Sequence, residues 1–170
     1  MTQAISDRAA RPTLTFWIVF CVAALVAFGA AVGNLADPLV MYDDYPALLA
    51  EPDRFWSKTL SEGRWVNYVW HLREVQTPSW VNFAAYQLMI AGLAALIAMM
   101  AIKPPDRVFY GGLAAALIVV SPASVALSFW ASTLLPGLAL CVAYGVLVLR
   151  GGYRIALWML LPFVIVTFMA

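Results

Sequence analysis

Apolar residues along this chain are gathered in long runs that polar segments separate. The first run covers residues 14–35, and the second covers residues 80–102. A helix needs about 20 apolar residues to cross a hydrocarbon core of roughly 30 Å, so each run is long enough to span a membrane. The first run also exceeds the roughly 7 to 15 apolar residues of a signal peptide, so we expect it to be retained. Residues 36–79 form the only long polar stretch and predict a large loop.

The second half of the chain carries an apolar region about twice as long as one span. It extends from Val108 to Leu149 without a charged residue. Such a region predicts a helical hairpin whose turn lies between Ser121 and Gly137. We therefore expect spans at 108–127 and 133–149, followed by a last, shorter apolar run at 155–170. The pattern predicts an all-α polytopic membrane protein, a single domain with about five transmembrane helices.

Composition supports the same class of protein. Hydrophobic residues make up 64% of the 170 residues and charged residues only 11%, whereas soluble domains carry about 25% charge. A net charge of +1 gives no reason to expect a nucleic-acid partner. Cys21 and Cys141 fall inside apolar runs without metal-ligand spacing, so we expect small core residues rather than a disulfide, a redox motif or a metal site.

A few polar and small residues interrupt the apolar runs. Asn82 and Gln87 are expected to face other helices rather than lipid. Gly29 and Gly33 have the GxxxG spacing that lets another helix of this chain or of a partner approach closely. Four serines recur every three or four residues, and we favour hydroxyls bonded back to their own helix over the wall of a polar cavity. These serines are Ser121, Ser124, Ser128 and Ser132.

Basic residues predict the orientation of the spans. They are concentrated before the first run, in the turn after the second and in the turn after the fourth. The residues concerned are Arg8, Arg11, Lys103, Arg107, Arg150 and Arg154. Short basic loops stay in the cytoplasm, so we expect a cytoplasmic N-terminus and an exoplasmic loop at 36–79.

The loop at 36–79 is rich in aromatic residues as well as charges. Asp53 is a plausible helix N-cap and Gly63 a plausible stop, and Phe55, Trp56 and Leu60 share one face between them. Amphipathic turns that carry tryptophan lie in the membrane interface rather than across it. We therefore expect one or two amphipathic juxtamembrane helices in this exoplasmic loop.

An acidic pair, Asp43 and Asp44, follows closely on the first apolar run. Two adjacent carboxylates near a membrane repel each other, so such a pair binds a cation, takes a substrate proton or lies in a solvated turn. Arg64 is the loop residue best suited to a phosphate, since its guanidinium forks onto two oxygens. A lipid-headgroup contact or an ion pair with a loop acid would explain Arg64 equally well.

The segments Asp43-Asp44-Tyr45 and Gly63-Arg64-Trp65, placed after a first span, resemble those of the GT-C superfamily of membrane glycosyltransferases. The likeness covers roughly residues 14–102 and is greatest to the bacterial glucosyltransferases that decorate O-antigen. It implies a multi-pass protein of the bacterial inner membrane that takes sugar from a polyprenyl-phosphate donor. It also implies transfer to a glycan or lipid acceptor of the cell envelope.

The resemblance implies a role for each of the three loop residues. Asp43 or Asp44 would be the catalytic base, and the other would orient it or bind a divalent cation. Arg64 would hold the phosphate of the donor. The chemistry agrees, because transfer to a hydroxyl needs a carboxylate within reach of its proton.

Members of this family are several times longer, with eight or more spans, so the likeness is to their N-terminal module. The alternative hypothesis is a non-catalytic small integral membrane subunit that packs against a partner membrane protein. A transporter or channel is disfavoured, because no predicted span carries a charged residue.

Overall fold

The computed structural model describes residues 2–36, 61, 77–103, 105–150 and 158, with side chains from Leu14 onward in the first helix. All regular elements in these ranges are helical, which confirms the predicted all-helical class for this part of the chain. They are α1 (Thr2–Ala30), α2 (Val32–Ala36), α6 (Ser79–Ala101), α7 (Phe109–Val119), α8 (Pro122–Leu127), the 3₁₀-helix η2 (Ser128–Trp130) and α9 (Ala131–Leu149).

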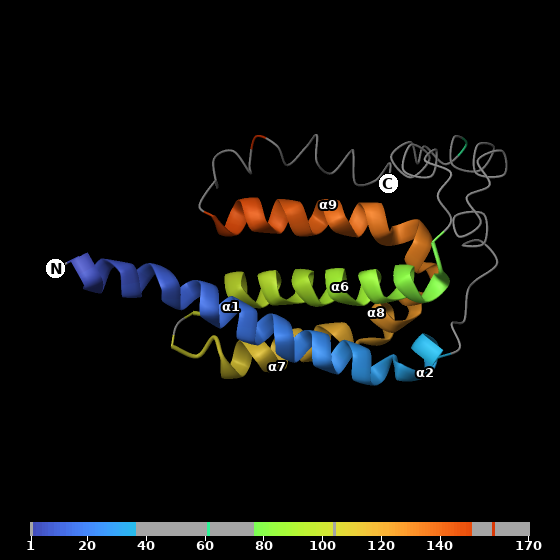
Figure 1. The fold of residues 1–170 in the computed structure, drawn as a ribbon, viewed down its shortest axis with the longest axis horizontal. Coiled ribbons are helices and arrows are strands. Elements are labelled where there is room, and N and C mark those ends of the chain that lie inside the picture. Colours follow the sequence, from blue (N-terminus) through green and yellow to red (C-terminus); the bar gives the residue numbers. More distant parts are fainter. Residues whose placement is uncertain (1, 37–60, 62–76, 104, 151–157, 159–170) are drawn as a thin grey trace.

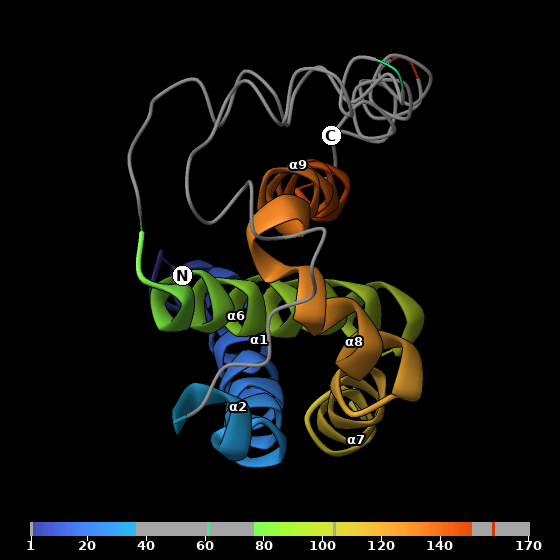
Figure 2. The same cartoon turned by 90° about the vertical axis from the view of Figure 1, so that its right-hand side faces the viewer.

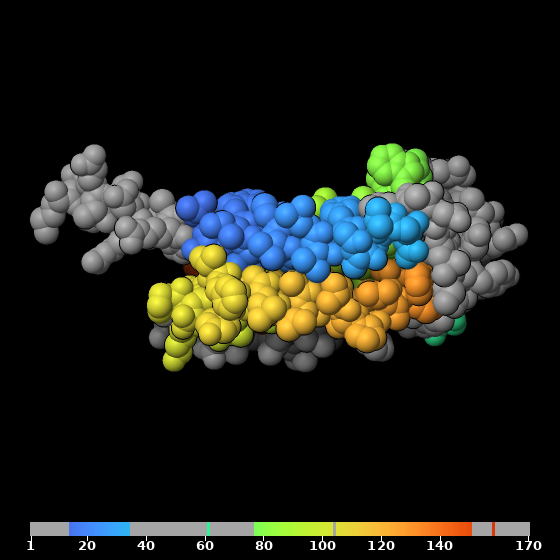
Figure 3. All heavy atoms as spheres, turned by 90° about the horizontal axis from the view of Figure 1, so that it is seen from below, coloured from blue at the N-terminus to red at the C-terminus, as the bar shows by residue number. Residues whose placement is uncertain are grey.

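Helix α6 is the centre of the bundle. It lies between α9 on one side and α1 and α7 on the other (Figures 1 and 2). Seen from the side of α1, the blue α1 and the yellow-to-orange α7 and α8 lie next to each other and form one continuous face (Figure 3). The neighbours of α6 therefore cover most of its circumference, and only a few of its side chains are exposed.

Contacts along α6 fix the direction of its neighbours. A side chain at Gly111 on α7 would lie 3.5 Å from Val19 and 4.0 Å from Ala98, near the C-terminal end of α6. Ser132 on α9 hydrogen-bonds to Asn82, near the N-terminal end of α6. Thus α1 and α7 run antiparallel to α6, whereas α9 runs parallel to it (Figure 1).

Residues 109–127 run along α6 as two helices rather than one. Helix α7 ends at Val119, and α8 begins after Ser121 with Pro122 in its first turn. Proline has no backbone N–H, so the intrahelical ladder is interrupted at this point. The chain reverses at η2, inside the range predicted for the hairpin turn, and returns as α9 (Figure 1).

The interior of the bundle is rich in alanine, with a few large side chains such as Phe83 and Leu96 among them, whereas many other large apolar side chains are exposed. The buried alanines on α1, α6 and α7 have at most 2% of their surface exposed; they are Ala23, Ala27, Ala91, Ala94, Ala95, Ala98 and Ala115. By contrast, Leu25 is 75% exposed and Leu117 is 61% exposed. Small residues let helices approach closely. Such packing is typical of membrane helices, which associate without a hydrophobic driving force because lipid is as apolar as the helix surface.

Two helical stretches among the described residues are long and apolar enough to cross a membrane. The first is Ser79–Ala101, which is α6. The second is Pro122–Leu149, to which α9 contributes 19 residues. The apolar part of α1, Leu14–Ala30, and α7 are shorter.

One expectation from the sequence is wrong. Cys21 is exposed on α1 rather than a core residue, because the side of α1 that faces the bundle is formed by Val19, Ala23 and Ala27. Cys141 is half-buried, and both thiols are free. Among the described residues nothing lies within 4 Å of a Cβ atom placed at Gly29 or Gly33, so the packing of a helix on this pair, from this chain or from a partner, stays a prediction.

Gly145 on α9 is packed tightly against α6. A Cβ atom there would lie 2.9 Å from Leu96 Cδ1, and Leu96 is only 1% exposed. We expect Gly145→Val to lower the free energy of unfolding by about 1–3 kcal/mol, because overpacking forces Leu96 out of place. Thermal unfolding of the detergent-solubilised protein, followed by circular dichroism, measures this loss.

Gly33→Val is the matched control, because open space surrounds Gly33. Combining Gly145→Val with Leu96→Ala should recover part of the lost stability, since the shortened side chain frees the space that valine needs. A Gly145→Val variant as stable as its Gly33→Val counterpart would contradict close packing of α6 on α9.

Candidate functional site at the loop end of the bundle

The three predicted site residues, Asp43, Asp44 and Arg64, lie outside the residues that the structure describes, as does the predicted surface helix at 53–63 apart from Ser61. The structure does describe where the chain leaves the bundle and where it returns. It leaves after Ala36 in α2 and returns at Thr77, and both residues lie at one end of the bundle together with η2 (Figures 1 and 2). We call this the loop end.

A buried polar cluster joins the returning chain to two helices at the loop end. The hydroxyl Oγ1 of Thr77 donates a hydrogen bond of 2.7 Å to Oδ1 of Asn82. In turn, Nδ2 of Asn82 donates a bond of 3.0 Å to Oγ of Ser132 on α9. Asn82 is 6% exposed and Ser132 is 4% exposed. The return of the loop is therefore fixed to the starts of both α6 and α9.

Local sequence explains why Thr77 is in place to make this contact. Pro78 precedes α6 with φ −55° and ψ 139°, and its carbonyl accepts from the amide of Val81 at 2.9 Å. Proline restricts the residue before it to extended conformations, which separates Thr77 from the helix that follows. The Thr77 hydroxyl can then reach over the first turn of α6 to Asn82.

The serine series divides between two roles. Ser124 Oγ donates to the carbonyl of Ile118 at 2.7 Å, and Ser128 Oγ donates to the carbonyl of Val125 at 2.6 Å. Ser121 caps α8 by accepting from the amide of Ser124. The favoured interpretation, a hydroxyl bonded back to its own helix, agrees with Ser128, whose acceptor lies three residues earlier. It is wrong for Ser124, whose acceptor Ile118 belongs to α7 rather than to α8. Ser132 also bonds across to another helix.

Burial of the polar residues on α6 is also confirmed. Gln87 is 5% exposed, so both it and Asn82 face other helices, as expected. Sequence reasoning missed Thr77 and the buried Thr133, which is next to Ser132. A threonine directly before the proline that opens a helix is the signal that could have identified Thr77.

The polar cluster holds only an amide and hydroxyls. At neutral pH such groups neither accept an acceptor proton as a base nor neutralise a phosphate. Their role is positional: they hold the end of the loop against the bundle. The chemistry of a transfer reaction would have to come from the loop that the cluster anchors.

Charged residues are segregated to the opposite end of the bundle. In the part of the chain that the structure describes, Lys103, Asp106, Arg107 and Arg150 all lie there, as does the start of α1 (Figure 1). We call this the basic end. No described residue from 14 to 36, from 77 to 102 or from 108 to 149 is charged.

Comparison with known proteins gives no match: no family model, no curated protein and no solved structure is similar enough to this chain to support an assignment. Conclusions about function therefore depend on the residues and on the geometry described above.

We expect the Asn82–Ser132 hydrogen bond to contribute about 0.6–1.7 kcal/mol, the range found for polar contacts between helices in membranes. A double-mutant cycle with Asn82→Ala and Ser132→Ala, measured by unfolding in detergent, isolates this coupling energy. Ser128→Ala is the matched control, because its hydroxyl bonds only within its own segment. Strictly additive losses in the cycle would show that the contact between the two side chains contributes nothing.

Proposed function

We propose that this chain is a polytopic membrane module of a glycosyltransferase that uses a lipid-linked sugar, with its loop end exoplasmic. The observation that carries the proposal is the segregation of charge. All charged residues of the described ranges lie at the basic end, and both connections to the acidic, aromatic loop lie at the other. Under the positive-inside rule the basic end faces the cytoplasm, which gives the loop the exoplasmic side.

Packing supports a lipid environment for the bundle. Alanines and several polar side chains are buried, and many large apolar side chains such as Leu25, Leu117 and Phe109 are exposed. An exposed apolar surface of this kind requires a partner, and on all sides of a bundle that partner is lipid. This supports a membrane location, and we extend the proposal to a bacterial plasma membrane and to the five crossings expected from the sequence.

Chain length restricts where the acidic pair can lie. Asp43 is seven residues beyond Ala36, and seven residues reach at most about 25 Å. The 23 residues of α6 extend about 34 Å, so a chain that leaves at the loop end cannot carry Asp43 to the basic end. Asp44 is under nearly the same restriction. Chain length thus keeps the pair away from the basic end, as an exoplasmic site for a lipid-linked donor requires.

In the proposed reaction, an acceptor hydroxyl attacks the anomeric carbon of the donor sugar. A new C–O bond forms, and the bond from that carbon to the phosphate oxygen breaks, so that the polyprenyl phosphate leaves with the electron pair. The hydroxyl proton passes to the carboxylate of Asp43 or Asp44. Arg64 balances the charge of the phosphate as it leaves, and the second carboxylate orients the base or binds a divalent cation.

A second candidate function is a non-catalytic subunit that packs against a partner membrane protein. One observation favours it. Gly29 and Gly33 are exposed next to Leu25 and Val32, and no described side chain fills the space beside them. A small-residue face flanked by large apolar side chains suits the close approach of a partner helix.

Orientation is tested by labelling single cysteines from outside the cell, in a variant that lacks Cys21 and Cys141. A cysteine at Ser57 should react with a membrane-impermeant maleimide, whereas one at Lys103 should react only after the membrane is opened. The expected reason is that the bilayer separates the loop from the basic end. The reverse pattern would overturn the orientation and, with it, the exoplasmic site.

The transfer reaction is tested by measuring sugar transfer and folded yield on the same variants. An amide cannot take the acceptor proton, so Asn in place of the base, Asp43 or Asp44, should lower turnover by about 10²–10⁴ with unchanged yield. The other Asp→Asn change should cost less, and Arg64→Ala should chiefly weaken donor binding. Full activity in both Asp→Asn variants would exclude the catalytic assignment.

A further inference from the structure

The turn between α6 and α7 at the basic end holds a preorganised guanidinium. Arg107 is half-buried, and its Nε donates a hydrogen bond of 2.6 Å to the carbonyl of Ile102, the residue that ends α6. This bond uses one of the five N–H groups of arginine and leaves the four on the terminal nitrogens. Lys103 is exposed in the same turn. The turn thus presents the terminal nitrogens of a fixed Arg107 guanidinium as hydrogen-bond donors, together with the exposed ammonium group of Lys103.

The start of α7 adds to the positive potential of this turn. Helix α7 begins at Phe109 without a side-chain cap and without an acidic residue in its first turn. The first amides of a helix carry a partial positive charge, and here no carboxylate in the first turn compensates it. Asp106 is the one acidic residue of the described turn, against Lys103 and Arg107. This turn together with Arg150 at the end of α9 carries a net charge of +2 (three basic residues, one acidic), apart from the charged residues at the start of α1.

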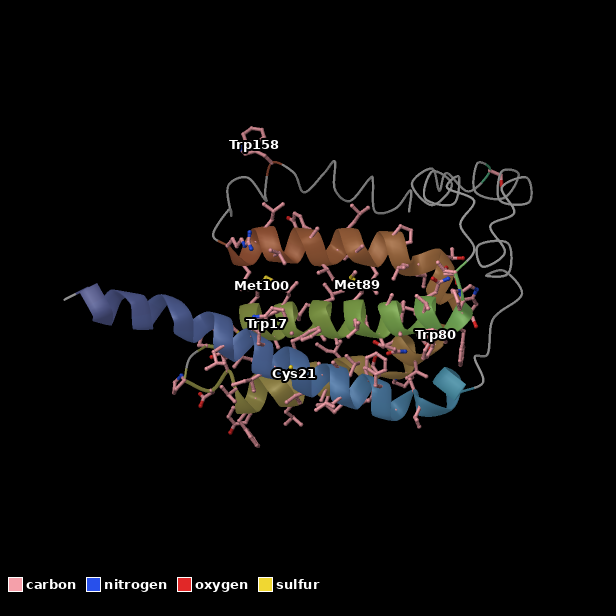
Figure 4. The ribbon with its side chains drawn as sticks, viewed as in Figure 1. Trp17, Cys21, Trp80, Met89, Met100 and Trp158 are labelled. Carbon is pink, nitrogen blue, oxygen red and sulfur yellow. The ribbon has the colours of Figure 1, made fainter. Side chains whose placement is uncertain are left out.

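Aromatic side chains lie just inside this charged layer. Phe109 is 72% exposed, and its ring contacts Tyr110 edge-on at 5.2 Å between centroids. Trp17 is exposed on α1 (Figure 4). It precedes Val19 by two residues, as Phe109 precedes Gly111, and Val19 lies beside Gly111 on the parallel helix α7. Exposed aromatic rings below a layer of cations match the headgroup boundary of a membrane.

We propose that the turn at Lys103 and Arg107 binds the phosphate of an anionic phospholipid in the leaflet that faces the basic end. Arg107 would hold two phosphate oxygens through its terminal nitrogens, and Lys103 would add charge. The acyl chains would lie against Phe109 and Trp17, which favours a lipid over a free phosphate ion. The net positive charge favours an anionic headgroup over a zwitterionic one. This inference rests on the membrane location argued above.

The test uses the full chain reconstituted in phosphatidylcholine vesicles that contain spin-labelled phosphatidylglycerol or spin-labelled phosphatidylcholine. The fraction of motionally restricted lipid gives the relative association of the two lipids. We expect phosphatidylglycerol to be preferred about fivefold by the unaltered chain, the effect expected of one cation near a membrane surface. Arg107→Gln should bring this preference close to unity, and Lys103→Gln should reduce it less.

Three further variants distinguish a specific headgroup site from nonspecific electrostatic attraction of anionic lipid. Arg107→Lys keeps the charge but loses the fork and the bond to Ile102, so it should retain only part of the preference. Asp106→Asn should raise the preference, because it removes the one described carboxylate of the turn. Lys58→Gln removes the same charge from the loop and should leave the preference unchanged, with circular dichroism confirming equal helix content throughout.

An unchanged preference in both Arg107→Gln and Lys103→Gln would overturn the proposal, as would an equal fall in Lys58→Gln. Equal association of the two lipids with the unaltered chain would also overturn it and would leave this turn as a surface for another protein. A complete lack of restricted lipid of either kind is a different result. It would refute the membrane location itself rather than the headgroup site.

Discussion

Close packing of small residues around α6 is the constraint on which the rest of the bundle depends. Ala94, Ala95 and Ala98 are almost fully buried, so the neighbouring backbones come near enough for dispersion contacts along their length. In a lipid environment there is little hydrophobic force between helices, and packing of this kind replaces it. The few large side chains inside, such as Leu96, are accommodated where a neighbouring helix offers a glycine, as Gly145 does.

Polar contacts add register to this packing. Alanine surfaces are nearly uniform along a helix, so they do not by themselves fix how far one helix slides along another. The hydrogen bonds from Thr77 to Asn82 and from Asn82 to Ser132 remove that freedom at the loop end. At the basic end, Arg107 performs a similar task by bonding the C-terminal carbonyl of α6. The uncharged core between them needs no further polar contact to be unique.

Much of the helical architecture could be predicted from the sequence, because long apolar runs determine where helices form. The range given for the hairpin turn contains the observed reversal, and the burial of Asn82 and Gln87 follows from the cost of exposing amides to lipid. The outward position of Cys21 could not be predicted, since α1 is apolar on every side and no polar face marks its orientation. Nor does the chain say which of its glycines are packed: Gly29 and Gly33 fit a known spacing, yet Gly111 and Gly145 are among those that lie against another helix, and Gly145 is the most tightly packed of the described glycines.

The candidate site is less accessible to sequence reasoning for a physical reason. The acidic pair and Arg64 are separated by 20 residues of loop, and apolar periodicity says nothing about how such a loop folds over the bundle. What the sequence supplied was chemistry, namely residue types suited to a base and a phosphate contact. The structure adds a restriction on where the loop is attached. The chain leaves and re-enters the bundle at one end, and the charged residues of the described bundle lie at the other end.

The chain runs along α6 from Phe109 to Leu127, and the interruption between α7 and α8 divides this stretch into two structurally different parts. From Phe109 to Val119 the chain is a regular helix that packs against the alanine core. After Val119, hydrogen bonds of the Ser121 and Ser124 hydroxyls connect α7 to α8. Helix α1 is interrupted at Ala31, which lies at a similar depth because Val19 and Gly111 are neighbours. Two of the three helices beside α6 are therefore interrupted toward the loop end, and the third, α9, carries Pro136 in its first turns there. All three neighbours of α6 thus lose regular helical hydrogen bonding on the side where the loop joins the bundle, whereas toward the basic end they are continuous helices.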